Sequence, residues 1–461
     1  MAINRTSPHG QWSSRTAFIL AATGSAVGLG NIWKFPYIAG EHGGGAFVLI
    51  YILCVLFIGI PIMLSEVYLG KRGRLNPIAS IRYISERENR SKHWKIIGLI
   101  GILSGILILS YYSVIAGWTM AYASRSAFGV LNNINAVGAA SMFENFVSDP
   151  ERLLAWHTMF SIITAIVVSK GVKSGLESAV IRLMPALLVL LLALVIFSAF
   201  EGDFLNGLKF MLYPDFSKVT WEMVLIAMGQ AFFSLSLGMG ALMVYGSYLS
   251  DDISIPQTCV IVASLDTLVA LLAGLAIFPI VISSGLEVSQ GPGLIFQTLT
   301  VAFGAMPGGQ LFGTLFFILL IFAAWTSAIS LIEPMIIWLI EKYDLTRKQA
   351  ATFAASLAWL LGIGTIVSFN VGSNIKIFNM TFFELLDYLT TNILLPMGGI
   401  MITIFVSWFI AKDNINSELK IKSRFLSSIW YLSARVLAPL AVIFIMLNAL
   451  GFNTNIFVYF N

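Results

Sequence analysis

The chain has 461 residues, of which 58% are hydrophobic and only 11% carry a charged side chain, and its formal net charge is +4. Soluble domains are about 25% charged, so this composition argues against a soluble globular protein. It predicts an all-α protein that crosses a membrane many times, with the lipid bilayer as a partner and no nucleic acid.

Eleven apolar segments follow a polar start at residues 1–15. A helix needs about 20 apolar residues to cross about 30 Å of hydrocarbon. Segments of that kind cover residues 16–38, 46–69, 97–123, 154–169, 179–200, 221–248, 255–283, 309–341, 349–369, 383–410 and 427–450. The sequence therefore predicts eleven transmembrane helices, followed by a short C-terminal segment, 451–461.

The basic residues predict the orientation of these helices. Lys and Arg favour cytoplasmic loops, and here they gather at residues 71–95, 170–182, 347–348 and 412–424. All four stretches follow even-numbered apolar segments and therefore fall on one side. We expect a plasma-membrane protein with its N-terminus in the cytoplasm and residues 451–461 outside.

The first apolar segment contains ATGSAVGLGNIWKFPY at residues 22–37, with three glycines followed by Asn31. Glycine inside a helix costs about 1 kcal/mol relative to alanine, so a break is expected. The sixth segment carries a similar Gly-x-Gly pattern at residues 236–240. Two breaks five segments apart predict two five-helix repeats, 16–200 and 221–410, and the odd repeat length inverts the second one.

Broken helices expose main-chain groups that lipid cannot satisfy. Free carbonyls suit a cation and half-helix N-termini suit an anion. Paired breaks therefore indicate a site near the middle of the bilayer for a zwitterion and small cations. The alternative is that these glycines permit close helix packing, which a single Gly-x-Gly would favour.

Five motifs carry a resemblance to a known family. They are GSAVGLGNIWKFPY at 24–37, GGGAF at 43–47, GQAFFSLSLGMG at 229–240, TSAISLIEP at 326–334 and LLDYLTTNILLPMGG at 385–399. Their order and spacing resemble the neurotransmitter:sodium symporter family, and the agreement extends along essentially the whole chain. The resemblance implies ten core helices and sodium-coupled uptake of amino acids or amines, without enzymatic activity.

The resemblance also implies two sodium sites made of oxygen ligands. The first would use Ala26, Asn31, Ser234 and Asp266, and the second would use carbonyls of Gly24, Val27 and Ala323 with the hydroxyls of Thr326 and Ser327. An alternative for the two hydroxyls is a hydrogen bond back to their own helix.

The implied substrate site combines both breaks with side chains of two further helices. Its residues would be Ala26, Gly28, Leu29, Gly30, Ile108, Tyr112, Phe233, Ser234, Ser236, Met239, Ser327 and Leu331. The side-chain pocket has no charged residue, and the thioether of Met239 is flexible. We therefore expect a hydrophobic amino acid of medium to large size, such as tyrosine, tryptophan or leucine.

The family places a gate on each side of its site. Outside, the resemblance implies a charge pair of Lys34 with Asp387 above an aromatic lid of Tyr112 and Phe233. Lysine lacks the bidentate fork of arginine, so a weaker latch is expected. Inside, the corresponding residues are His9, Glu341, Ser247 and Tyr248. Whether Arg5 or Arg15 joins this inner gate is left open.

Asp266 departs from the asparagine usual in the family. A carboxylate inside a membrane costs about 2.5–3.5 kcal/mol on insertion scales unless it faces a partner. Chloride-dependent relatives hold an anion nearby, and bacterial relatives often carry a glutamate at the position of Ala270. We therefore expect Asp266 to contact sodium and replace chloride, whereas Glu66 is expected to be structural.

Two alternatives to a transporter are a channel and a receptor that binds the same solute without moving it. An aromatic lid argues against an open channel, and only a flux measurement separates a receptor from a transporter. A membrane enzyme is the least favoured, because Glu66, Asp266 and Glu333 lie on different predicted helices without a nearby His or Cys.

Overall fold

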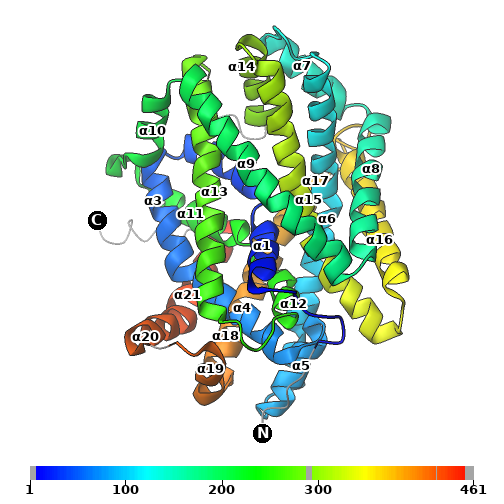
Figure 1. The fold of residues 1–461 in the computed structure, drawn as a ribbon, viewed down its shortest axis with the longest axis vertical. Helices are drawn as coiled ribbons and strands as arrows, with labels where there is room; N and C mark the ends of the chain where they lie inside the picture. Colours follow the sequence, from blue (N-terminus) through cyan, green and yellow to red (C-terminus); the bar gives the residue numbers. More distant parts are fainter. Residues whose placement is uncertain (1–6, 287–292, 422, 452–461) are drawn as a thin grey trace.

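The computed structural model describes residues 7–286, 293–421 and 423–451, and this part of the chain forms a bundle of helices (Figure 1). Its extended pairing is limited to two isolated bridges, between Gly44 and Pro214 and between Ile377 and Met380. The all-α prediction is therefore confirmed. Arg5 and residues 452–461 of the expected C-terminal segment 451–461 lie outside the described residues.

The first half of the chain supplies ten α-helices joined by short π and 3₁₀ turns. They are α1 (Arg15–Ala26), η1 (Gly30–Lys34), α2 (Phe35–Glu41), α3 (Gly45–Cys54), η2 (Val55–Gly59), α4 (Ile60–Gly73), α5 (Pro77–Arg87), η3 (Lys92–Lys95), α6 (Ile96–Ala127), α7 (Ala136–Val147), α8 (Pro150–Ser169), η4 (Val172–Glu177), α9 (Ser178–Glu201) and α10 (Phe204–Leu212).

The second half has the same character. Its elements are η5 (Phe216–Lys218), α11 (Trp221–Ser234), α12 (Ala241–Ser247), α13 (Ile255–Ser283), η6 (Leu294–Thr298), α14 (Leu299–Ala305), α15 (Gly309–Tyr343), α16 (Arg347–Ser368), α17 (Phe382–Tyr388), η7 (Leu389–Leu394), α18 (Leu395–Ile404), η8 (Phe405–Phe409), α19 (Lys412–Leu419), α20 (Arg424–Leu432), η9 (Ser433–Leu437) and α21 (Ala438–Ala449).

Nine helices in the described residues are long and apolar enough to cross a membrane. A tenth crossing results if α1 and the helix Gly30–Glu41, which meet at 53°, form one span. The expected sixth span is divided into α11 and α12, each too short to cross alone. The count of eleven therefore stays a prediction, although every predicted apolar segment is helical apart from the breaks in 16–38 and 221–248.

The break between α11 and α12 arises from left-handed backbone at Ser236, Gly238 and Gly240, whose φ angles are 54°, 80° and 75°. Glycine adopts this conformation freely. Ser236 is held in it because its Oγ donates to the carbonyl of Ser25 at 2.8 Å, which joins the two breaks. Glu66 Oε2 accepts the freed N–H of Gly238 at 3.0 Å, in agreement with a structural role for Glu66.

The break after α1 depends on close approach rather than on positive φ. Val27 leaves the helix in an extended conformation, with φ −68° and ψ 107°. A Cβ atom at Gly28 would lie 2.6 Å from Ser327 Oγ, and one at Gly30 would lie 3.0 Å from the ring of Phe233. Only glycine lets the broken main chain lie against these side chains.

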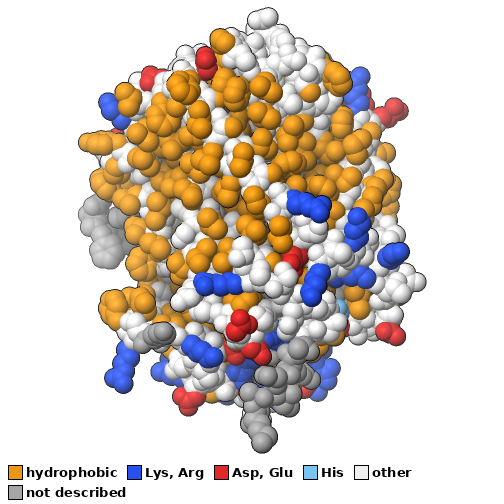
Figure 2. All heavy atoms as spheres, in the orientation of Figure 1, with side chains coloured by type: hydrophobic (Ala, Val, Ile, Leu, Met, Phe, Trp, Pro, Cys, Tyr) orange, Lys and Arg blue, Asp and Glu red, His pale blue; other side chains and the backbone are white. Residues whose placement is uncertain are grey.

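The outer surface fits a bilayer. Figure 2 shows a broad hydrophobic band, with Lys and Arg gathered toward the lower end, where α5 and α19 lie in Figure 1. Inside the band, α6 and α15 pack together at the centre, and α1 packs against α13 and α15. Cys54 and Cys259 are free and buried.

Candidate functional site

A cavity of about 350 Å³ lies between the two breaks. It is lined by Ala26, Gly28, Gly30, Ile108, Tyr112, Phe233, Ser236, Met239, Ser327 and Leu331. All ten belong to the predicted substrate set, of which Leu29 and Ser234 are the remaining members. No charged side chain lines the cavity.

One end of the cavity presents hydrogen-bond donors. The hydroxyl of Tyr112 accepts from the N–H of Leu29 at 3.2 Å and remains free to donate its own proton. Its neighbour Tyr111 instead meets Thr390 Oγ1 at 3.1 Å and packs on Phe383. Of two adjacent tyrosines, the structure therefore directs Tyr112 to the break in the first helix.

Asn31, Ser234 and Asp266 meet beside the cavity. Asn31 Nδ2 donates to Ser234 Oγ at 2.9 Å and to Asp266 Oδ1 at 2.8 Å. Ser234 Oγ donates to the other carboxylate oxygen, Oδ2, at 2.5 Å. The amide N–H therefore lies among acceptor oxygens that a hard cation could use, and rotation of the amide would add its own oxygen. This donor set fits sodium.

Tyr51 of α3 completes this cluster, and the sequence did not point to it. Its hydroxyl lies 3.1 Å from Ser234 Oγ and 3.4 Å from Asp266 Oδ2. The two carboxylate oxygens thus face different partners: Oδ1 faces Asn31, whereas Oδ2 faces two hydroxyl groups. All these side chains are fully buried, so a lost hydrogen bond could not be replaced from bulk water.

A second oxygen-rich position lies where α15 passes the end of α1. Ser327 Oγ reaches the carbonyls of Val27 and Gly24 at 3.2 and 3.5 Å. Thr326 Oγ1 instead bonds to Ala323 and Phe322 of its own helix, each at 3.1 Å. Of the two hydroxyls, only that of Ser327 spans the helices, while Thr326 adopts the alternative of a bond within its helix.

The outer gate differs from the expected charge pair. Among the described residues no ion pair joins Lys34 to Asp387. The ammonium group of Lys34 lies 4.5 Å from the ring centroid of Phe233, and Asp387 Oδ1 accepts from Thr391 Oγ1 at 3.1 Å. A lysine has one compact ammonium group rather than a fork, and here it covers the aromatic lid.

The inner side is closed by the N-terminal segment. His9 Nε2 lies 2.7 Å from Glu341 Oε1, and Asn76 also donates its main-chain N–H to that oxygen at 2.8 Å. The indole of Trp12 donates to the carbonyl of Tyr245 at 3.0 Å. His9 thus takes the basic position of this gate. Arg15 begins α1 and makes no ion pair in the described part of the chain.

A buried ion pair lies behind this closure. Glu333 accepts from the hydroxyl of Tyr248 at 2.7 Å and from Arg347 Nη2 at 2.6 Å. Tyr248 is thus hydrogen-bonded to this ion pair, whereas the hydroxyl of Ser247 bonds to Val244 within its own helix, and the role of both residues in a gate stays a prediction. The partnership of Glu333 with Arg347 was missed because nothing in the sequence relates α15 to the start of α16.

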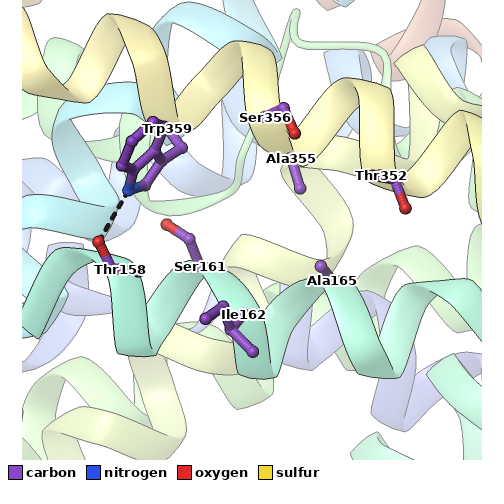
Figure 3. A pocket seen from close by; sticks show the side chains of 8 residues that line it. All are labelled: Thr158, Ser161, Ile162, Ala165, Thr352, Ala355, Ser356 and Trp359. Atoms are coloured by element: carbon purple, nitrogen blue, oxygen red, sulfur yellow. Dashed lines mark hydrogen bonds between the residues drawn. The ribbon is translucent and has the colours of Figure 1, made fainter.

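A separate hollow of about 550 Å³ lies on the outer surface between α8 and α16 (Figure 3). Figure 3 shows Trp359 reaching across it, where the indole N–H donates to Thr158 Oγ1 at 2.9 Å. The hollow shares no lining residue with the cavity at the breaks and contains no main-chain break of its own. It is therefore not the candidate substrate site.

The chain matches the Sodium:neurotransmitter symporter family over residues 9–136 and 142–459. It is 36% identical to the uncharacterized sodium-dependent transporter YhdH of Bacillus subtilis, over 96% of this chain and 98% of that protein. It is 32% identical to the uncharacterized sodium-dependent transporter MJ1319 of Methanocaldococcus jannaschii, over 94% and 89% of the two chains.

A solved structure gives the same fold. The crystal structure of MhsT in complex with L-phenylalanine is similar to this chain, with a TM-score of 0.87 and 42% identity. The match covers 95% of this chain and 99% of the MhsT chain.

Proposed function

The chain belongs to the sodium:neurotransmitter symporter family, and we propose that it imports a hydrophobic amino acid of medium to large size together with two sodium ions. Members of this family are sodium-dependent secondary transporters in the membrane and are not enzymes. The observation that carries the proposal is the uncharged cavity of about 350 Å³ between the two broken helices.

The polar end of the cavity supports an amino acid as the substrate. The α-carboxylate would accept from the main-chain N–H groups of Leu29 and Gly30 and from the hydroxyl of Tyr112. The ammonium group would donate to carbonyls of Ala26, Phe233 and Ser234. Two of these groups have partners that the substrate would have to share or displace: the carbonyl of Phe233 accepts from the N–H of Ser236 at 3.1 Å, and the N–H of Leu29 donates to Tyr112 at 3.2 Å. The others lie at the breaks, where main-chain groups lose their helical partners.

The apolar end supports a hydrophobic side chain. Ile108, Leu331 and Met239 line it, and each is at most 4% exposed. A charged substrate side chain would lose its hydration there without a partner. L-Phenylalanine in the MhsT structure is a substrate-sized ligand of the same chemical class, which supports this choice.

The two oxygen clusters support sodium coupling. The first ion would be held by Ala26, Asn31, Ser234 and Asp266, with the substrate carboxylate beside it. The second would be held by the carbonyls of Gly24, Val27 and Ala323 with Thr326 and Ser327. The second site joins α1 to α15, so its occupancy would favour the conformation in which the inner side is closed.

Two cations moving inward through 100 mV release about 4.6 kcal/mol. Because 1.4 kcal/mol is a factor of ten in an equilibrium, this supports accumulation of about a thousandfold before any concentration gradient is added. Coupling requires that the outer and inner sides close alternately. The outer side would be closed by Lys34, Phe233 and Tyr112. The inner side would be closed by His9, Trp12 and Glu341.

We also propose that uptake is independent of chloride. Asp266 directs Oδ2 at the hydroxyls of Tyr51 and Ser234. Without the carboxylate, the two hydroxyl groups could both donate to a halide ion. Because the carboxylate of Asp266 supplies a negative charge at this position, a halide ion would not be needed.

Uptake into proteoliposomes tests the proposal. With an inward sodium gradient, we expect saturable accumulation of phenylalanine or leucine that collapses with the gradient and is competed by hydrophobic, not charged, amino acids. Ser327→Ala should lower the apparent sodium affinity. Ser330→Ala is the matched control, because Ser330 Oγ bonds to the carbonyl of Ser327 within the helix.

Each rival would give a different result. Binding without accumulation would identify a receptor, and flux that never saturates would identify a channel. Equal sodium dependence of the two serine variants would remove Ser327 from the proposed site.

A further inference from the structure

Arg435 lies within the span Arg424–Ala449, yet no carboxylate in the described part of the chain forms an ion pair with it. Its Nε donates to the carbonyl of Ser407 at 2.7 Å. That single bond leaves the two Nη groups without a hydrogen-bond acceptor from the described residues. An arginine inside a membrane span is costly unless an anion or water reaches it.

Aromatic rings hold this guanidinium in place. It lies 5.4 Å from the ring centroid of Trp408 and 5.8 Å from that of Tyr431. The indole N–H of Trp408 donates to the carbonyl of Arg435 at 3.3 Å. The turn that contains Arg435 is a π-helix, Ser433–Leu437, a distortion that is frequent at functional sites.

A second cation and an unused donor lie at the same ring. Lys412 Nζ of α19 is 5.5 Å from the ring centroid of Tyr431. The Tyr431 hydroxyl is shielded from solvent and has no hydrogen-bond partner. Asp413, beside Lys412, is exposed and forms no ion pair in the described part of the chain. Arg435 and Lys412 therefore both lie near the ring of Tyr431, whose hydroxyl is unpaired, and the carboxylate of Asp413 lies within electrostatic range of the same tyrosine.

The depth of this position matches a phospholipid headgroup. Arg90 donates to the carbonyl of Phe409, the last residue of η8, at 3.0 Å. Ser407 lies only two residues further into the bundle. Tryptophan and tyrosine favour the same interfacial level, and Figure 1 places α19 and α20 in the lower part of the molecule, where α5 also lies.

An apolar surface continues from the cations along α21. Val436, Leu437, Leu440 and Ile443 are each about 40–50% exposed. A phosphate group needs donors and cations, whereas acyl chains need this kind of surface. The cations lie next to the apolar surface, just as the phosphate of a phospholipid lies next to its acyl chains.

We propose that Arg435, Lys412 and Tyr431 form a binding site for the phosphate of an anionic phospholipid of the inner leaflet, whose acyl chains lie along α21. The site is separate from the transport cavity, since it shares no residue with it. The site would bind the lipid whether or not the chain transports an amino acid.

Native mass spectrometry of the delipidated, purified full-length protein tests the site. We expect the wild type to retain dioleoylphosphatidylglycerol in preference to dioleoylphosphatidylcholine. Each basic residue near an anionic surface contributes roughly a factor of five to lipid affinity, and Arg424→Gln should lose no more than this general attraction. Arg435→Gln should weaken phosphatidylglycerol binding by more than about fivefold, because it also removes the direct contact with the phosphate. Arg424→Gln is the matched control, because Arg424 is an exposed cation that opens the same span.

Equal retention of the two lipids by the wild type would overturn the proposal, as would an equal loss in Arg435→Gln and Arg424→Gln. Inorganic phosphate that displaces phosphatidylglycerol at equal concentration would assign the site to a free anion instead. If Arg435→Gln does not fold, Lys412→Gln and Tyr431→Phe provide the test, and unchanged phosphatidylglycerol binding in both would refute the site.

Discussion

Replacing Asp266 with asparagine gives the sharpest test of the proposed sodium and chloride chemistry. The substitution keeps the shape of the side chain and one oxygen, but removes a negative charge from a fully buried cluster. In the wild type, Oδ1 faces Asn31 at 2.8 Å and Oδ2 faces Ser234 at 2.5 Å. The carboxylate therefore serves both neighbours, and an amide can replace only one of its two acceptor oxygens.

The magnitude follows from the charge that is lost. A cation held about 4 Å from a carboxylate gains about 4 kcal/mol at an effective dielectric constant of about 20. That energy corresponds to about a thousandfold in affinity. Because the amide oxygen still coordinates, we expect the sodium concentration for half-maximal uptake to rise by between about tenfold and about a thousandfold in the absence of chloride.

The substitution should create a chloride requirement or abolish uptake. In Asp266→Asn the hydroxyls of Tyr51 and Ser234 lose their carboxylate acceptor and can donate to an anion instead. Uptake into proteoliposomes is measured in sodium chloride and in sodium gluconate. The wild type should be equally active in both, whereas the variant should be inactive in gluconate and either regain activity in chloride or stay inactive.

Asp387→Asn provides the control for this measurement. It removes an acid that accepts from Thr391 and lies outside the cluster, so its uptake should not become dependent on chloride. A chloride requirement in the wild type would refute the reasoning. So would an Asp266→Asn variant that transports equally well in both salts.

Three further substitutions address the cavity and its lid. Met239→Phe narrows the apolar end, so competition assays should show a shift toward smaller aliphatic amino acids, and an unchanged preference would remove Met239 from the pocket. Gly28→Ala brings a Cβ to 2.6 Å from Ser327 Oγ. Overpacking of this kind costs about 1–3 kcal/mol, so substrate binding should weaken about tenfold in a scintillation proximity assay while the protein still folds. Lys34→Met removes the cation 4.5 Å from the Phe233 ring. Because a cation–π contact contributes about 0.5–1 kcal/mol, its loss should speed substrate dissociation about two- to fivefold. An unchanged rate would exclude a role in the lid.

Local sequence determined where the helices run and where they break. Residues 255–283 were predicted as a span and form α13 with those bounds. The break at residues 236–240 could be located because Gly238 and Gly240 can adopt positive φ at little cost, a property of the residue itself. The resemblance to a family then assigned roles to side chains, and ten of those residues line one cavity.

The partners of charged and hydroxyl groups were decided only by the tertiary structure. Thr326 and Ser327 are adjacent and chemically alike, yet one bonds within its helix and the other reaches α1. Lys34 lies over Phe233 rather than against Asp387. Such choices depend on distances of a few ångströms between helices that are far apart in the sequence. Hydrogen bonds and ion pairs weaken steeply over such distances, so the relative placement of the helices determined which contacts form.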